Sequence, residues 1–86
     1  MSEPVSIFKE IETELRKTIA YLTGNDDLTN ADPDVPFKEL GVDSMMAIEI
    51  MAVMEKKFKI HLQEKDIAKA TNIKNAVAVL SEYLNK

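Results

Sequence analysis

Residues 40–58 read LGVDSMMAIEIMAVMEKKF, and this stretch decides the fold that the sequence predicts. Its apolar residues follow helical spacing, because at about 100° per residue one side of a helix collects Ala47, Ile50, Met51, Met54 and Phe58. Asp43 suits the cap of such a helix, since its carboxylate accepts hydrogen bonds from exposed amides of the first turn. We therefore expect a helix that begins at Asp43 or Ser44, ends near Phe58 and buries this stripe.

The same helix carries a second group of apolar residues. This group is Met45, Ile48 and Ala52, and it is centred about 140° around the helix from the core stripe. Its charged neighbours are Glu49, Glu55 and Lys56. Either the preceding loop or a short later helix covers it, or it is an exposed patch rimmed by charge, which marks a docking surface. Both explanations can be true at once if the loop or the short helix covers only part of this group.

About twenty residues before this helix, 25–43, show no periodicity and include two prolines and Gly41. Loops of this length inside a small domain are usually functional or disordered. Five apolar residues are expected to pin the loop over the bundle: Leu28, Val35, Phe37, Leu40 and Val42. We also expect a single helical turn over Phe37–Leu40, which Gly41 then ends.

Helical spacing recurs on both sides of these segments. A first helix over residues 6–23, closed by Gly24, is predicted by the stripe Phe8, Ile11, Leu15, Ile19 and Leu22. A weak third helix is expected over Glu64–Ala70. A last helix, capped by Thr71 or Asn72, is predicted by Ile73, Val77, Leu80 and Leu84. The fold class is therefore all-α: a small four-helix bundle of three longer helices and a short third one, with a long loop between the first and second helices.

Length and composition limit the function. The 86 residues fit one domain, 1–86, and the absence of cysteine excludes disulfides, thiolate metal sites and a cysteine nucleophile. No apolar run approaches a membrane span, and the first residues do not resemble an export signal, so we expect a cytoplasmic protein without membrane insertion. A net charge of −4 opposes nucleic-acid binding.

Metal binding is not expected either. His61 is the one histidine, which is too few for an ordinary zinc site. At alternate positions of the loop, Asn30, Asp32 and Asp34 resemble the start of a calcium loop, but Val35 and Gly41 stand where that loop needs Gly and Glu.

Charge divides along the sequence. Residues 1–43 hold ten acidic and four basic residues, whereas residues 44–86 hold five acidic residues and seven lysines. The first half is therefore net negative and the second net positive, so we expect one domain whose charge is polarised along the sequence. An acidic surface suits a basic protein partner.

Ser44 lies where the long loop meets the helix. On physical grounds it can act as a cap, and a helix N-terminus also favours a phosphate ester on a side chain there. As a nucleophile of its own it lacks a base, because His61 is roughly 20 Å away along a helical path at ~1.5 Å per residue. No catalytic residue is therefore expected.

The segment Leu40-Gly41-Val42-Asp43-Ser44-Met45 resembles the acyl carrier protein family, and Phe37, Phe58, Ile67 and Thr71 stand in the matching register. The resemblance covers nearly the whole chain. It implies that a phosphopantetheinyl transferase attaches 4′-phosphopantetheine from coenzyme A to the Ser44 hydroxyl, and that the thiol of this arm carries acyl intermediates as thioesters. It implies a carrier that serves partner enzymes and is not itself an enzyme.

The resemblance also assigns roles to other residues. The expected partner-docking residues are Asp43, Met45, Ile48, Glu49, Ala52, Glu55 and Lys56, and the expected arm-flanking residues are Leu40, Val42 and Ile67. The implied partners are the transferase and acyl transferases, synthases or acyl-activating ligases, which a monomeric carrier would visit in turn.

Some positions depart from carriers of primary fatty-acid synthesis. Those usually have a polar or acidic residue where this chain has Met46, and acids where it has Lys56 and Lys57. We infer a specialised carrier for fatty-acid, polyketide or related lipid synthesis, because charge at a docking rim changes partner choice. Asp43 favours acyl over aminoacyl cargo. The alternatives are an aminoacyl or peptidyl carrier of a nonribosomal pathway, and an unmodified helical adaptor in which Ser44 only caps.

Overall fold

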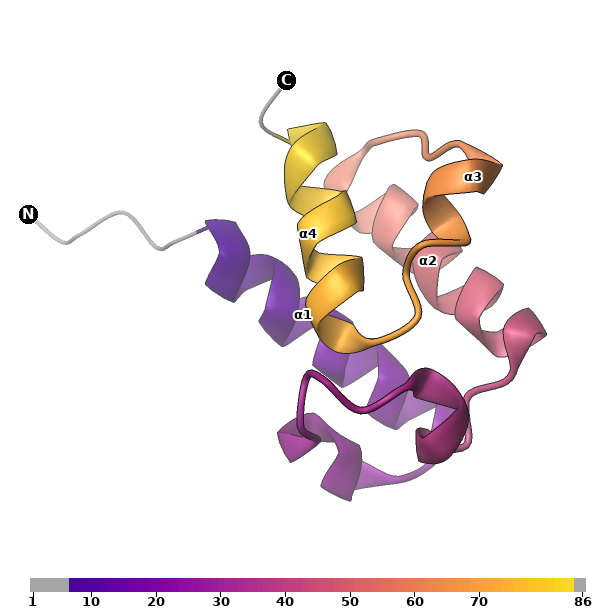
Figure 1. The fold of residues 1–86 in the computed structure, drawn as a ribbon. Coiled ribbons are helices and arrows are strands. Elements are labelled where there is room, and N and C mark those ends of the chain that lie inside the picture. Colours follow the sequence, from indigo (N-terminus) through magenta and orange to yellow (C-terminus); the bar gives the residue numbers. More distant parts are fainter. Residues whose placement is uncertain (1–6, 85–86) are drawn as a thin grey trace, which may run out of the picture.

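The computed structural model describes residues 7–84, which contain helical segments and no strand. In chain order these segments are α1 (Ile7–Thr23), η1 (Asp26–Asn30), η2 (Phe37–Leu40), α2 (Ser44–Phe58), α3 (Glu64–Ile67) and α4 (Ile73–Leu84), where η denotes a 3₁₀ helix. The predicted all-α fold with four α-helices is confirmed. In Figure 1, α4 lies across α1, and α3 lies on the other side of α4 from the start of α1.

The core forms where α1, α2 and α4 meet, and helical spacing places its side chains. Completely buried residues come from all three helices: Ile11, Leu15 and Ile19 of α1, Ile50, Met51 and Met54 of α2, and Ile73 and Leu80 of α4. These residues belong to the predicted stripes, because residues three and four apart share one face of a helix. Leu22, Ala47, Phe58 and Leu84 are partly buried and pack against this core.

Phe8 departs from the prediction. It was expected in the core stripe of α1, but its side chain is 52 % exposed. The spacing from Ile11 is correct, but the first turn of α1 extends beyond α4 in Figure 1, and the Phe8 ring there is half exposed. Ser6, where that helix was expected to start, lies outside the described residues.

The loop between α1 and α2 is pinned to the bundle. Leu28, Phe37 and Val42 are buried as expected, and Leu40 packs partly against the core. Val35 was expected to be a fifth anchor, but it is only half-buried and lies outside the core cluster, in a turn closed by its amide donating to the Asp32 carbonyl at 3.1 Å. The predicted turn over Phe37–Leu40 is η2, whereas η1 was not predicted.

Hydrogen bonds reinforce this pinning. Arg16 of α1 donates from Nη1 to the Thr29 and Ala31 carbonyls at 3.1 and 2.6 Å, so its guanidinium holds the end of η1. The Phe37 amide donates to the Thr71 carbonyl at 2.8 Å, which ties η2 to the segment before α4. The loop is therefore a built part of the fold. The sequence pattern did not single out Arg16.

The short helix α3 ends earlier than expected. It was predicted to reach Ala70, but it ends at Ile67, and the chain then turns through residues 68–72. The turn buries Ala70, which is 4 % exposed, and leaves the Thr71 carbonyl free to accept from Phe37. The last helix is capped by Asn72, whose Oδ1 accepts from the Asn75 amide at 2.7 Å.

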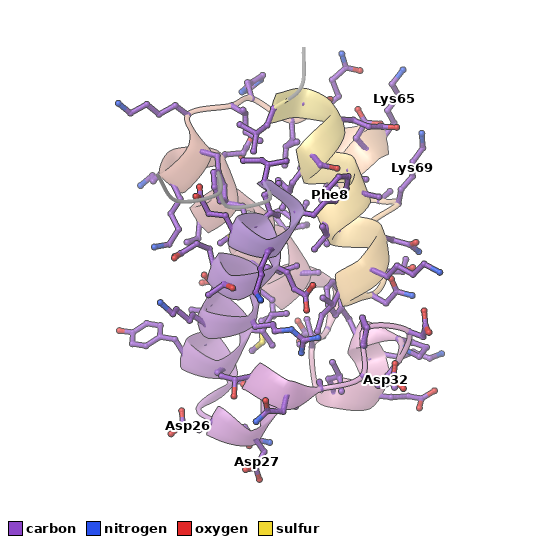
Figure 2. All side chains as sticks on the ribbon, turned by 90° about the vertical axis from the view of Figure 1, so that its left-hand side faces the viewer. Phe8, Asp26, Asp27, Asp32, Lys65 and Lys69 are labelled. Carbon is purple, nitrogen blue, oxygen red and sulfur yellow. The ribbon has the colours of Figure 1, made fainter. Side chains whose placement is uncertain are left out.

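Charge is separated in space as well as in sequence. Figure 2 shows Asp26, Asp27 and Asp32 at one end of the molecule, where the 3₁₀ helices lie, and Lys65 and Lys69 toward the other end. The contrast between the acidic first half and the more basic second half of the sequence is therefore visible on the surface.

Replacing Phe37 by Ala should lower the free energy of unfolding by about 3 kcal/mol, because a large core side chain is lost and the loop loses its main anchor. Phe8→Ala is the matched control and should cost less than about 1 kcal/mol, since that ring is half exposed. Urea unfolding followed by circular dichroism measures both. Equal losses would show that Phe8 belongs to the core after all.

Candidate functional site

The start of α2 is fixed by three consecutive residues. Gly41 adopts a left-handed conformation, with φ of +83°, which ends η2 and favours glycine. Val42 is buried, and its amide donates to the Phe37 carbonyl at 3.0 Å. Asp43 is extended and accepts from the Met46 amide through Oδ1 at 2.8 Å, which is the expected N-cap. The helix therefore begins at Ser44.

Ser44 is exposed at this helix N-terminus. The first amides of an α-helix have no partner inside the helix, and its dipole adds positive potential at this end. Covalently attached phosphate is favoured in that position. The arrangement thus presents an accessible hydroxyl in surroundings that suit a phosphodiester.

An open-sided groove of about 1060 Å³ lies beside Ser44. Its walls come from four parts of the chain: Pro36 with Phe37 and Lys38 of η2; Val42 and Asp43 before α2, with Ser44, Ala47 and Ile48 of α2; Glu64 and Ile67 of α3; and Ala68, Ala70 and Thr71 of the turn that follows. The lining is mainly apolar, which is typical of ligand sites with a few polar groups.

Two of the three predicted arm-flanking residues line this groove. Val42 and Ile67 do so, whereas Leu40 is not among the lining residues and packs partly against the core. Sequence reasoning missed Ala47, which was assigned to the core stripe but also lines the groove. It missed Thr71 as well, because the turn that brings this residue to the groove has no local signal.

The second apolar stripe of α2 is exposed. Met45 and Ile48 are 77 % and 56 % exposed, and Ala52 is exposed beside them. Of the two explanations, cover by the loop or by α3 is therefore wrong for most of this stripe. Ile48 also lies at the groove, so the stripe and the groove share an edge.

The charged residues predicted beside this stripe differ in their surroundings. Glu49 and Lys56 are exposed, as is Asp43 at the cap. Glu55, in contrast, is engaged within the chain: its Oε2 accepts from the Leu62 amide at 2.7 Å, and its side chain is 24 % exposed. Glu55 thus orders the chain after α2, a role that its position in the sequence did not reveal.

His61 lies beyond the far end of α2 from Ser44, and its side chain is 97 % exposed, as expected for a surface residue. Within residues 7–84, His, Asp and Glu side chains form no cluster of three that could hold a metal ion. Among the helices of those same residues, none has the length and apolar character needed to cross a membrane.

The ionisable groups with shifted pKa values lie where α3 contacts α4, away from the lining of the groove. The Tyr83 hydroxyl of α4 donates to Asp66 Oδ2 at 2.5 Å and holds the pKa of that carboxyl below its usual value, with help from the nearby ammonium groups of Lys69 and Lys65. The same hydrogen bond raises the pKa of the Tyr83 phenol. The Gln63 amide also donates to the Tyr83 oxygen, at 3.2 Å.

An exposed hydroxyl at a helix N-terminus beside an apolar groove defines a domain that can hold a covalently attached arm. Comparison with known proteins identifies the arm: the family model described as the phosphopantetheine attachment site matches residues 13–80. The chain belongs to this family. It is a carrier protein of the phosphopantetheine type, and 4′-phosphopantetheine is its covalent cofactor.

A solved structure shares the fold of this chain. It is that of an acyl carrier protein from Thermotoga maritima, which superposes with a TM-score of 0.83, covers 96 % of each chain and shares 23 % of the residues. The residues around Ser44 fit a phosphopantetheine arm, because the helix N-terminus favours the phosphate and the groove offers a wall along which a linear chain can lie. A carrier of this kind interacts with a modifying transferase and with synthetic enzymes.

Acidification should destabilise the α3 wall. Because the pKa of Asp66 in the folded protein is below its ordinary value of 3.8, its contact with Tyr83 contributes stability that is fully present above that value. The contribution is lost as the pH falls from there through the lower folded-state pKa. The wild type should therefore have a higher urea midpoint than Asp66→Asn at neutral pH, and this difference should shrink below about pH 4. A difference that does not change with pH would contradict the assignment.

Proposed function

We propose that this chain is an acyl carrier protein whose Ser44 hydroxyl bears the 4′-phosphopantetheine arm. The terminal thiol of that arm supplies the group on which acyl intermediates are held as thioesters. The pathway we propose is fatty-acid, polyketide or related lipid biosynthesis, with the chemistry performed by partner enzymes and none by the carrier.

One observation supports Ser44 above all others. The chain has four serines, and Ser44 is the one that falls within the matched residues 13–80. Ser81 is 3 % exposed and donates to the Ala78 carbonyl at 3.0 Å, so its hydroxyl is enclosed. Ser44 is exposed at a helix N-terminus, where a transferase can reach it.

The attachment reaction asks little of the carrier. The Ser44 oxygen forms a bond to the phosphorus that bears the pantetheine of coenzyme A, and the bond from that phosphorus to the adenosine bisphosphate half breaks. The transferase takes the hydroxyl proton. The carrier therefore needs an accessible oxygen in surroundings that accept negative charge, and the start of α2 provides both.

Acyl cargo is favoured by the groove beside Ser44. Ala47, Ile48, Ile67 and Val42 make this part of its wall apolar, and an apolar chain gains from removal of its surface from water. The alternative, an aminoacyl or peptidyl carrier, has the same fold and the same arm. Loading assays distinguish an acyl carrier from an aminoacyl or peptidyl carrier. The first should accept acyl groups from acyl transferases, and the second should accept amino acids from adenylating enzymes.

The docking surface that we propose for partner enzymes follows the exposed side of α2. It consists of Asp43, Met45, Ile48, Glu49, Ala52 and Lys56, with Glu55 ordering its far end. Exposed apolar side chains rimmed by charge are typical of interaction sites. Because Lys56 adds a positive charge to a rim that also holds Asp43 and Glu49, a partner with a uniformly basic patch should bind less well than one of mixed charge.

Incubation with coenzyme A and a broad-specificity phosphopantetheinyl transferase should add the mass of one phosphopantetheine to the wild type. Ser44→Ala should gain none, because the accepting oxygen is gone. Intact mass spectrometry measures both, and Ser81→Ala is the matched control, which should be modified normally. Modification of Ser44→Ala, or failure of the wild type with several transferases, would refute attachment at Ser44.

The same assay tests the docking surface. Ile48→Glu should lower kcat/KM for the transferase by about tenfold, because a contact of this size removed from water contributes over 1 kcal/mol. Tyr21→Ala is the control, since Tyr21 is 83 % exposed on α1. Equal rates for wild type and Ile48→Glu would show that the enzyme docks elsewhere.

A further inference from the structure

The short helix α3 depends on contacts outside itself. It has four residues, none of them fully buried, and a helix of this length is not stable alone. Its position is therefore set by what holds it to the rest of the bundle. Since α3 supplies one wall of the groove, those contacts also set the width of the groove.

Both ends of the segment around α3 are anchored. Before it, Leu62 is 4 % exposed and its amide donates to Glu55 of α2 at 2.7 Å. After it, the Thr71 carbonyl accepts from the Phe37 amide at 2.8 Å. Between these two anchors, Ile67 packs partly against the core, and α4 adds polar contacts to the helix.

Tyr83 of α4 contacts this segment at two points, one within α3 and one at its N-cap. Its hydroxyl donates to Asp66 Oδ2 at 2.5 Å, and its oxygen accepts from the amide of Gln63, the residue that caps α3, at 3.2 Å. The hydrogen bond to Asp66 is charge-assisted and therefore among the stronger kinds. Lys69 Nζ lies 3.6 Å from the other oxygen of the same carboxylate. We name the contact between Tyr83, Asp66 and Gln63 the α3 clamp.

The clamp and the groove lie on different sides of α3. Glu64, Ile67 and Ala68 line the groove, and their spacing of three and four residues places them on one face. Asp66 is not among the lining residues and reaches toward α4 instead. A substitution at the clamp therefore changes the position of α3 but leaves all the side chains that line the groove in place.

We infer that the α3 clamp is a specificity-determining contact of this carrier: by holding α3 against α4, Tyr83 limits how far the groove beside Ser44 opens and how much of the arm and its cargo it shields. The part that concerns the arm rests on the proposed attachment at Ser44. The part that concerns α3 does not, so the two can fail separately.

The first test uses the unmodified protein. Tyr83→Phe keeps the ring and removes the hydroxyl, and amide hydrogen exchange over residues 63–70 should become at least about tenfold faster, because a hydrogen bond to a charged group is lost. Exchange in the core of α1 should be unchanged. Tyr21→Phe is the matched control, since it removes a phenol oxygen from an exposed ring.

A double variant shows whether the effect passes through the clamp. Asp66→Ala should accelerate exchange over the same residues, and adding it to Tyr83→Phe should change little further, because both changes break the hydrogen bond between Tyr83 and Asp66. Unchanged exchange in Tyr83→Phe, or effects of the two changes that simply multiply, would overturn the inference.

The second test uses the protein carrying the arm, with an environment-sensitive fluorophore on its thiol. Emission should shift to the red in Tyr83→Phe, because the loosened wall admits water, and should not shift in Tyr21→Phe. Faster exchange without this shift would show that the clamp holds α3 but does not govern the groove. If no arm can be attached, the proposed function fails, while the exchange experiment still decides on the clamp.

Discussion

The hydrogen bond from the Met46 amide to the Asp43 carboxylate, at 2.8 Å, fixes where α2 begins, and the site depends on that position. Because the helix starts at Ser44, the Ser44 hydroxyl lies in its first turn. Val42, two residues earlier, is buried in the core and anchors the chain there. A start one residue later would rotate every side chain of α2 by about 100° relative to the groove. Gly41 makes this start possible, because its left-handed conformation ends η2 just before it.

The groove, in contrast, is assembled from segments that are far apart in the sequence. Phe37 and Thr71 both line the groove, and a backbone hydrogen bond of 2.8 Å joins them. This bond ties η2 to the turn after α3. Arg16 holds the loop from the side of α1, and Tyr83 holds α3 from α4. Contacts from α1 and α4 thus position a loop and a four-residue helix beside Ser44.

This division explains what the sequence could and could not predict. The three longer helices, their core stripes and the cap at Asp43 follow from local spacing, and the structure confirms them. Phe8 was misjudged because its burial depends on where α1 extends past α4. Ala47 and Glu55 were given incomplete roles, since the groove and the bond to Leu62 arise only once other segments are in place. The sequence also could not show whether the second apolar stripe of α2 is covered, because the cover depends on where the loop and α3 lie in the fold.

The most direct measurement is peptide mapping of the protein purified from its native cells. Trypsin cleavage after Lys38 and Lys56 releases residues 39–56, a fragment in which Ser44 is the sole hydroxyl-bearing side chain. If Ser44 at the start of α2 bears the arm, mass spectrometry should find phosphopantetheine on this fragment. Phosphopantetheine on any other fragment, with residues 39–56 unmodified, would contradict it.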